Sequence, residues 1–266
     1  MAKRTAAKAV STIVAKKARC VDSGLPFDLE TGMALLRSHP ATAHLPITYG
    51  LPPLYTEANN VTKSHFQATC YTIFSQQVAD TAALSMYERF LEVGGATPNA
   101  VLSEVGWCLT GPAPTKRNDI VKNAEHFHAL REKMGTSGAK LASVIAVAAS
   151  WQSIEVLLNE SPVNASQLRE TLTGLHGVGP WSVDMILMFK FRLPDILPVG
   201  DLAFRRGLAA TFEVGRELNS NKKEDVEVME EIGEQFEGYR SVLSWYMYRV
   251  CDASKKNSKK KTKKEK

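Results

Sequence analysis

The segment 175–179 reads Leu-His-Gly-Val-Gly and has a composition suited to binding an anion. Glycine adopts positive φ without a steric penalty and lets another backbone approach closely, so Gly177 and Gly179 allow both features. Pro180 fits the first position of a following helix, where its missing N–H is no loss. The amides at the start of that helix would point at one spot, so the segment predicts a site for a phosphate group.

A glycine hairpin between helices is more often only a tight turn. The residues downstream strengthen the interpretation, because Asp201 follows Gly179 by 22 residues and begins a segment with two adjacent arginines, the first being Arg205. Asp201 also has a structural interpretation, since Asp is a frequent helix N-cap. The two roles are compatible, because capping holds the carboxylate in place. Asp184 and Asp195 are the neighbouring acidic alternatives.

The hairpin, the Leu-Pro-Val-Gly loop at 197–200 and Asp201 together resemble the helix-hairpin-helix DNA glycosylases (the HhH-GPD superfamily). The resemblance is closest to the DNA-3-methyladenine glycosylase II branch and covers residues 66–252. It implies an all-α, two-lobed fold with Asp201 as the catalytic carboxylate. It also implies that the protein flips alkylated bases, such as 3-methyladenine or 7-methylguanine, out of double-stranded DNA and removes them by Asp-assisted hydrolysis in base excision repair.

Three residues are expected to line the base pocket. An alkylated purine carries positive charge, which electron-rich aromatic faces attract. Trp181 directly follows the hairpin, and the resemblance places Tyr248 in the pocket from the last helix. Met185 stands where some relatives have an aromatic residue, which leaves the range of accepted bases open. A core position is the alternative for Trp181 and for most aromatics near Tyr248, while Tyr71 and Trp107 are weaker pocket candidates.

Further residues are expected to contact DNA. In the resembling enzymes, a side chain at the position of Gln77 fills the gap left by an extruded base, although Gln76 and Gln77 are also ordinary residues for a helix end. Lys116 follows a rigid Gly-Pro-Ala-Pro loop and is expected at the phosphate backbone, with exposure on a helix as the alternative. The predicted DNA-binding residues are Gln77, Lys116, Gly177, Gly179 and Arg205.

Trp181 also bears on the reaction product. Relatives that cut the DNA strand carry at this position a Lys whose amine attacks the sugar to form a Schiff base. An indole has no such amine. The sequence therefore predicts a monofunctional enzyme that leaves an abasic site and has no lyase activity.

The positioning elements are predicted to be helices, because no strand pattern of any length appears. Asp28 is expected to cap a helix ending near Ser38, and Thr97-Pro98 to begin another. Helices are also expected at 115–134 and 140–159. One lobe is predicted at 66–190, ending in the hairpin, and the other at 25–65 with 191–253. The cleft between the lobes is expected to hold Asp201.

The charge is distributed unevenly. The net charge of the whole chain is +5. Residues 1–21 carry a net charge of +6 and residues 254–266 carry +7, so the residues between them carry −8. We expect disordered basic tails at 1–24 and 254–266 that add salt-sensitive affinity for DNA, or that are simply solvated. Lys-rich runs also serve nuclear import, so a nuclear location is expected, with an organelle or the bacterial cytoplasm as alternatives.

The four cysteines lie far apart and form no Cys-x-x-Cys pair, which argues against a zinc site or an iron–sulfur cluster. We expect no metal and no cofactor, except a possible monovalent cation at the hairpin. No signal peptide or membrane span is visible, and a monomer is expected. Two other functions stay open: a related glycosylase for a mismatched or oxidised base, and a non-catalytic DNA-binding protein that uses the hairpin as a phosphate clamp.

Overall fold

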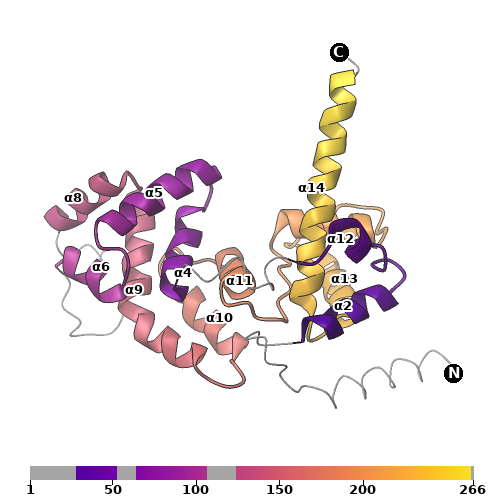
Figure 1. Ribbon diagram of the computed structural model, residues 1–266, viewed down its shortest axis with the longest axis horizontal. Helices are drawn as coiled ribbons and strands as arrows, with labels where there is room; N and C mark the ends of the chain where they lie inside the picture. The colour runs from indigo at the N-terminus through magenta and orange to yellow at the C-terminus, as the bar shows by residue number, and fades with distance from the viewer. Residues whose placement is uncertain (1–27, 53–63, 107–123, 265–266) are drawn as a thin grey trace. The chain divides into compact units, whose positions relative to one another are not determined.

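The computed structural model describes residues 28–52, 64–106 and 124–264, and every regular element in these ranges is a helix (Figure 1). The all-α class predicted from the sequence is therefore confirmed. The chain divides into two compact units: unit 1 contains Met1–Thr56 and Arg192–Lys266, and unit 2 contains Glu57–Phe191. Each unit has its own buried apolar core.

Unit 2 is built around its longest helix, α9 (Gly138–Leu158). Most of the residues of α9 are buried, because α4, α6, α8 and α10 all pack against it. Such a helix is apolar on most of its faces, as expected for an element surrounded by others. The helices of this unit in the described residues are α4 (His65–Phe74), α5 (Asp80–Glu92), α6 (Pro98–Glu104), α8 (Ala124–Met134), α9, α10 (Ala165–Thr173) and α11 (Pro180–Phe189).

By length and composition alone, α9 could also cross a membrane. However, 67% of its most apolar window is buried inside the unit, which is the behaviour of a core helix. The sequence separates the two cases poorly, because a fully surrounded core helix and a membrane span are both apolar all round.

Side-chain caps begin several helices where the sequence predicts them. Asp28 accepts a hydrogen bond from the Glu30 amide at 3.0 Å and caps α2 (Leu29–Ser38). Thr97 accepts one from the Ala100 amide at 3.2 Å and caps α6, with Pro98 at its first position. Both predicted helix starts are confirmed, because a cap depends only on residues within one turn.

Two expectations for unit 2 differ from the structure or lie outside it. The spacing of Phe66, Cys70, Ile73, Phe74 and Val78 in the sequence predicts one apolar helical stripe, but Val78 is not part of it, because α4 ends at Phe74 and Val78 is 39% exposed. The predicted helix at 115–134 appears as α8 from Ala124, and residues 107–123 lie outside the described residues.

Unit 1 combines the described residues from both ends of the chain. Its helices are α2, α3 (Leu45–Tyr49), α12 (Leu202–Thr211), α13 (Lys223–Glu234) and α14 (Arg240–Lys264). The N-terminal part of α14 is the core of the unit: Tyr246 is fully buried and donates a hydrogen bond from its hydroxyl to the Gly50 carbonyl at 2.7 Å. Burial raises the pKa of Tyr246 to about 12. Trp245 is buried as well, although the sequence pattern places it on the other face of the helix.

The tightest packing in unit 1 is between α12 and α14, which lie side by side (Figure 1). At Gly207 the two backbones approach so closely that a Cβ atom would overlap the carbonyl oxygen of Met247. A glycine is required at this contact because any side chain would push α12 away from α14.

The C-terminal segment differs from its prediction. From residue 254 the sequence predicts a disordered tail, but α14 continues as a helix to Lys264. Lysine is a good helix former, and a helix already nucleated by packing adds further residues at little cost. Repulsion between like charges therefore does not prevent the helical extension here.

Candidate active site and DNA-binding residues

The predicted hairpin connects α10 to α11 in unit 2. Gly177 has a φ of 72°, in the left-handed region that favours glycine, and it lies directly against Ser143 of α9. Gly179 instead has a φ of −81° and is the N-cap of α11, so the positive φ that glycine allows is adopted at Gly177 and not at Gly179. An extended N-cap leaves the first amides of α11 directed outward, which is the geometry that binds a phosphate group.

The two glycines give a matched pair of variants. Gly177→Ala should lower the free energy of unfolding by about 1–3 kcal/mol, because it combines a strained φ with overlap on Ser143. Gly179→Ala should leave it unchanged, since φ is ordinary and no atom lies within 4 Å of the added methyl group. Gly179→Ala should nevertheless weaken binding to undamaged duplexes of any sequence, because a phosphate contact carries no base information. Urea unfolding and fluorescence anisotropy measure the two effects, and unchanged duplex binding by Gly179→Ala would exclude the phosphate clamp.

The accessible face of α11 is apolar. Residues 182–184 and 186–188 are buried, whereas Trp181, Met185 and Phe189 are more accessible. These three residues follow one another at intervals of four. Residues four apart lie on the same helix face, so Trp181 and Met185 form one continuous surface. The Trp181 side chain is 38% exposed, so the core alternative for this residue is wrong.

Gln77 lies in the loop between α4 and α5. It is exposed and has a φ of 56°, which is unusual for a residue other than glycine. The preceding residue, Gln76, points the other way and donates hydrogen bonds to the Gly177 carbonyl at 3.1 Å and to the Ser182 hydroxyl at 2.8 Å. The loop that carries Gln77 is thereby attached to the hairpin.

Asp201 is the N-cap of α12 in unit 1. Its Oδ1 accepts a hydrogen bond from the Phe204 amide at 2.9 Å, and its own amide donates to the Pro198 carbonyl at 2.9 Å. The capping role expected from the sequence is confirmed.

The two acidic alternatives are bound in ion pairs. Asp184 is buried and pairs with Arg169 at 2.5 Å, joining α11 to α10. Asp195 receives two hydrogen bonds from the Arg240 guanidinium, each at 2.5 Å, and this pairing raises the pKa of Arg240. Both carboxylates therefore have structural partners that account for their burial.

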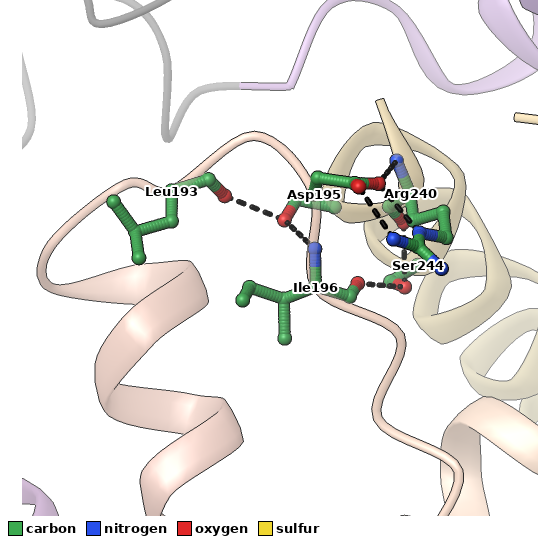
Figure 2. Close-up of polar contacts among 6 residues, drawn as sticks. Leu193, Asp195, Ile196, Arg240 and Ser244 are labelled. Carbon is green, nitrogen blue, oxygen red and sulfur yellow. Dashed lines mark hydrogen bonds and ion pairs between the residues drawn. The ribbon is translucent and has the colours of Figure 1, made fainter. Parts of the chain in front are cut away.

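The loop between α11 and α12 is fastened to the start of α14 (Figure 2). Next to the pair between Asp195 and Arg240, the buried Ser241 hydroxyl donates to the Leu193 carbonyl at 2.6 Å and accepts from the Ile196 amide at 3.0 Å. The Ser244 hydroxyl donates to the Ile196 carbonyl at 3.2 Å. These bonds fix the backbone five residues before Asp201, so the loop that delivers this carboxylate is rigid.

Arg205 has partners inside unit 1. Its Nη1 donates to the Leu218 carbonyl at 3.0 Å and its Nε to the Asp201 carbonyl at 3.4 Å. Arg206 is more exposed, at 49%, and lies 3.6 Å from Glu217. The DNA contact expected of Arg205 stays a prediction, and the structure adds a role for it in supporting the Asp201 turn.

Tyr248 lies on the part of α14 that is only half-buried, one position after Met247. Tyr248 and Asp201 belong to unit 1, whereas Trp181, Met185 and Gln77 belong to unit 2. Lys116 and Trp107 lie outside the described residues. In the part of the chain that the structure describes, no three His, Cys, Asp or Glu side chains are grouped as metal ligands would be.

Comparisons with known proteins show which proteins the chain is similar to, although no family model matches it. The chain is 25% identical to a DNA-3-methyladenine glycosylase of Saccharomyces cerevisiae over 225 residues, which is 75% of this chain and 71% of the yeast protein. It is 26% identical to DNA-3-methyladenine glycosylase 1 of Schizosaccharomyces pombe over 147 residues, 54% of this chain and 57% of that protein.

A solved structure shows the same fold. The 3-methyladenine DNA glycosylase of S. pombe in complex with abasic DNA superposes with a TM-score of 0.57 and 20% identity, covering 82% of this chain and 95% of that one. The chain therefore has the fold of this glycosylase, and its sequence is similar to DNA-3-methyladenine glycosylases. The resemblance to the helix-hairpin-helix DNA glycosylases expected from the sequence motif is thus confirmed, and so is the all-α fold.

The residues that hold the hairpin and the Asp201 loop are not predicted by the sequence. Gln76, like Gln77, has the sequence pattern of a polar residue at a helix end, and nothing in the sequence indicates the bonds to Asp195, Ser241 and Ser244. These partners are separated by 45 to 106 residues in the chain, so no local pattern indicates them.

Proposed function

We propose that this protein is a monofunctional DNA N-glycosylase that removes alkylated bases of the 3-methyladenine and 7-methylguanine type. The observation that carries the proposal is the position of Asp201, the carboxylate that follows the hairpin where the resemblance expects it. Asp201 accepts a hydrogen bond from the Phe204 amide as the N-cap of α12, at the end of a loop that Ser241 and Ser244 fasten to α14. The names of the relatives support the same substrate class.

In the proposed mechanism the enzyme first extrudes the damaged nucleotide from the stack, at a cost of a few kcal/mol that is smallest for damaged bases. Gln77 fills the gap, while the amides at the hairpin bind a backbone phosphate. The bond between base and sugar then breaks through an oxocarbenium-like transition state. The Asp201 carboxylate stabilises the positive charge that develops on the sugar and directs a water molecule to it.

The leaving base requires little assistance. An alkylated purine is already cationic, so it departs as a neutral base without a strong general acid. We propose that Trp181 and Tyr248 hold it by cation–π attraction, worth about 0.5–2 kcal/mol each. Met185, on the same face of α11 as Trp181, contributes a polarisable apolar contact and influences which bases fit.

The basic ends of the chain suit the same substrate. Residues 254–266 include eight lysines, which displace counterions from DNA and make binding depend on salt. We propose that this segment adds sequence-independent affinity for double-stranded DNA, that the protein acts as a monomer, and that its Lys-rich runs direct it to the nucleus.

The products of the reaction test the proposal. Incubated with methylated duplex DNA, the protein should release alkylated bases and leave an intact strand that breaks only on heating or in alkali. Borohydride added during turnover should trap no covalent adduct, because Trp181 carries no amine. The nearest downstream lysine, Lys190, is the C-cap of α11 and lies over the Tyr71 ring. It is about 14 Å along the helix axis from Trp181 at 1.5 Å per residue, which is too far to supply the missing amine.

Chromatography of the released bases and gel analysis of the strand measure these outcomes. An established lyase-active glycosylase incubated with its own lesion duplex serves as the positive control for trapping. Release of mismatched or oxidised bases instead of alkylated ones would move the protein to another substrate class. Efficient trapping would overturn the monofunctional assignment.

A further inference from the structure

Two adjacent glutamines of unit 2 have opposite environments. Gln77 is exposed at the tip of the loop between α4 and α5, whereas Gln76 reaches back to the hairpin through its amide nitrogen. One of its acceptors, the Ser182 hydroxyl, is 3% exposed and belongs to the first turn of α11. The other is the Gly177 carbonyl at the centre of the hairpin.

The backbone at Gln77 requires such support. A glutamine with a φ of 56° lies in the left-handed region, which is unfavourable for residues with a Cβ atom. Conformations of this kind persist only where neighbouring contacts hold them. Because Gln76 is the residue immediately before, its two hydrogen bonds fix the point from which the chain turns and directs Gln77 outward.

The hairpin and the end of α4 are themselves held by α9. Ser143 lies against Gly177, and the Lys140 ammonium donates to the Phe74 carbonyl, the last of α4, at 2.5 Å. Partial burial lowers the pKa of Lys140. The loop of Gln77 thus lies between two fixed points, and Gln76 is its link to the hairpin.

We infer that Gln76 is a positioning residue that connects phosphate binding at the hairpin to insertion of Gln77 into the DNA. The inference rests on the proposed function, in which the hairpin binds a phosphate and Gln77 fills the gap left by an extruded base. A hairpin seated on the backbone holds the Gly177 carbonyl and the Ser182 hydroxyl at a fixed place relative to the duplex. The hydrogen bonds of Gln76 hold the loop at a fixed position relative to the hairpin, so that the Gln77 side chain is already placed at the gap.

A double-mutant cycle tests the link. Gln76→Met keeps the length of the side chain but removes the amide donor, and Gln77→Ala removes the inserted group. The full chain is titrated with two duplexes, one undamaged and one with a stable tetrahydrofuran abasic site facing 2-aminopurine. The ratio of the two affinities and the aminopurine fluorescence report how well the gap is filled, and neither requires release of a base.

Each single variant should lower the preference for the abasic duplex by about tenfold, because Gln77→Ala removes the inserted side chain and Gln76→Met removes the hydrogen bonds that position it. The double variant should show the same tenfold loss, since Gln76 acts only through Gln77 and the effects of coupled residues do not add. The aminopurine signal should fall equally in all three variants. The matched control is Gln67→Met, because Gln67 also donates to a carbonyl, that of Ala96, but away from the hairpin. This variant should keep the full preference.

A hundredfold loss in the double variant would show independent roles and overturn the inference. So would an unchanged preference in Gln76→Met, or a wild-type protein without preference for the abasic duplex. If Gln76→Met does not fold, Gln76→Glu replaces it, since a carboxylate has the same shape and cannot donate to the Gly177 carbonyl. Release of alkylated bases by the wild type is measured separately, so failure of the proposed function is distinguished from failure of the link.

Discussion

Asp201→Asn should abolish base release while leaving the fold and DNA binding nearly intact. The amide cannot stabilise a positive charge on the sugar, and loss of one such electrostatic contribution typically slows the chemical step by about 100–1000-fold. Asn is as good an N-cap as Asp, so its side-chain oxygen can still accept the hydrogen bond from the Phe204 amide. Single-turnover release of methylated bases at saturating enzyme measures the loss.

Two controls separate chemistry from structure. Asp201→Ser also keeps a capping oxygen without a carboxylate, so it should be as inactive as the Asn variant and nearly as stable. Asp195→Asn weakens the pair with Arg240 and should mainly lower the free energy of unfolding. If Asp201→Asn turned over at close to the normal rate, the carboxylate would have no role in the reaction.

The features that the sequence predicts correctly depend on short stretches of chain. Asp28, Thr97 and Asp201 each bond to an amide two or three residues later, so their types and positions contain the necessary information. The same is true of Gly177, whose turn is formed by its own neighbours. The hairpin motif could therefore be found, and with it the resemblance to the helix-hairpin-helix DNA glycosylases.

The features that the sequence does not predict depend on contacts between distant segments. Gln76 looks like any polar residue after a helix until its partners, more than a hundred residues away, are known. Ser241 and Ser244 would normally be placed on a solvated face, yet both are fully buried because they bind the loop before Asp201. At Gly179, the residue type permits positive φ but does not require it, so the turn alone could not settle its conformation.

Gly207→Ala should disrupt unit 1 and reduce base release together. The added methyl group would overlap the Met247 carbonyl oxygen, and this oxygen belongs to the backbone of α14 and cannot rotate away. The helices must then separate, and strain of this kind in a packed core costs about 1–3 kcal/mol. Because α12 carries Asp201 at its start and α14 carries Tyr248 next to Met247, the shift moves both residues. A displacement of about 1 Å at reacting groups can slow a reaction by about a hundredfold.

Urea unfolding and single-turnover base release measure the two effects of Gly207→Ala. The matched control is Ala210→Ser, a small change on the exposed face of the same helix, which should alter neither quantity by much. The decisive comparison is with Asp201→Asn, which should lose the chemistry without losing stability. A Gly207→Ala protein with normal stability and normal base release would show that α12 does not depend on this contact. Loss of stability with unchanged base release would show that the contact supports the unit without positioning Asp201.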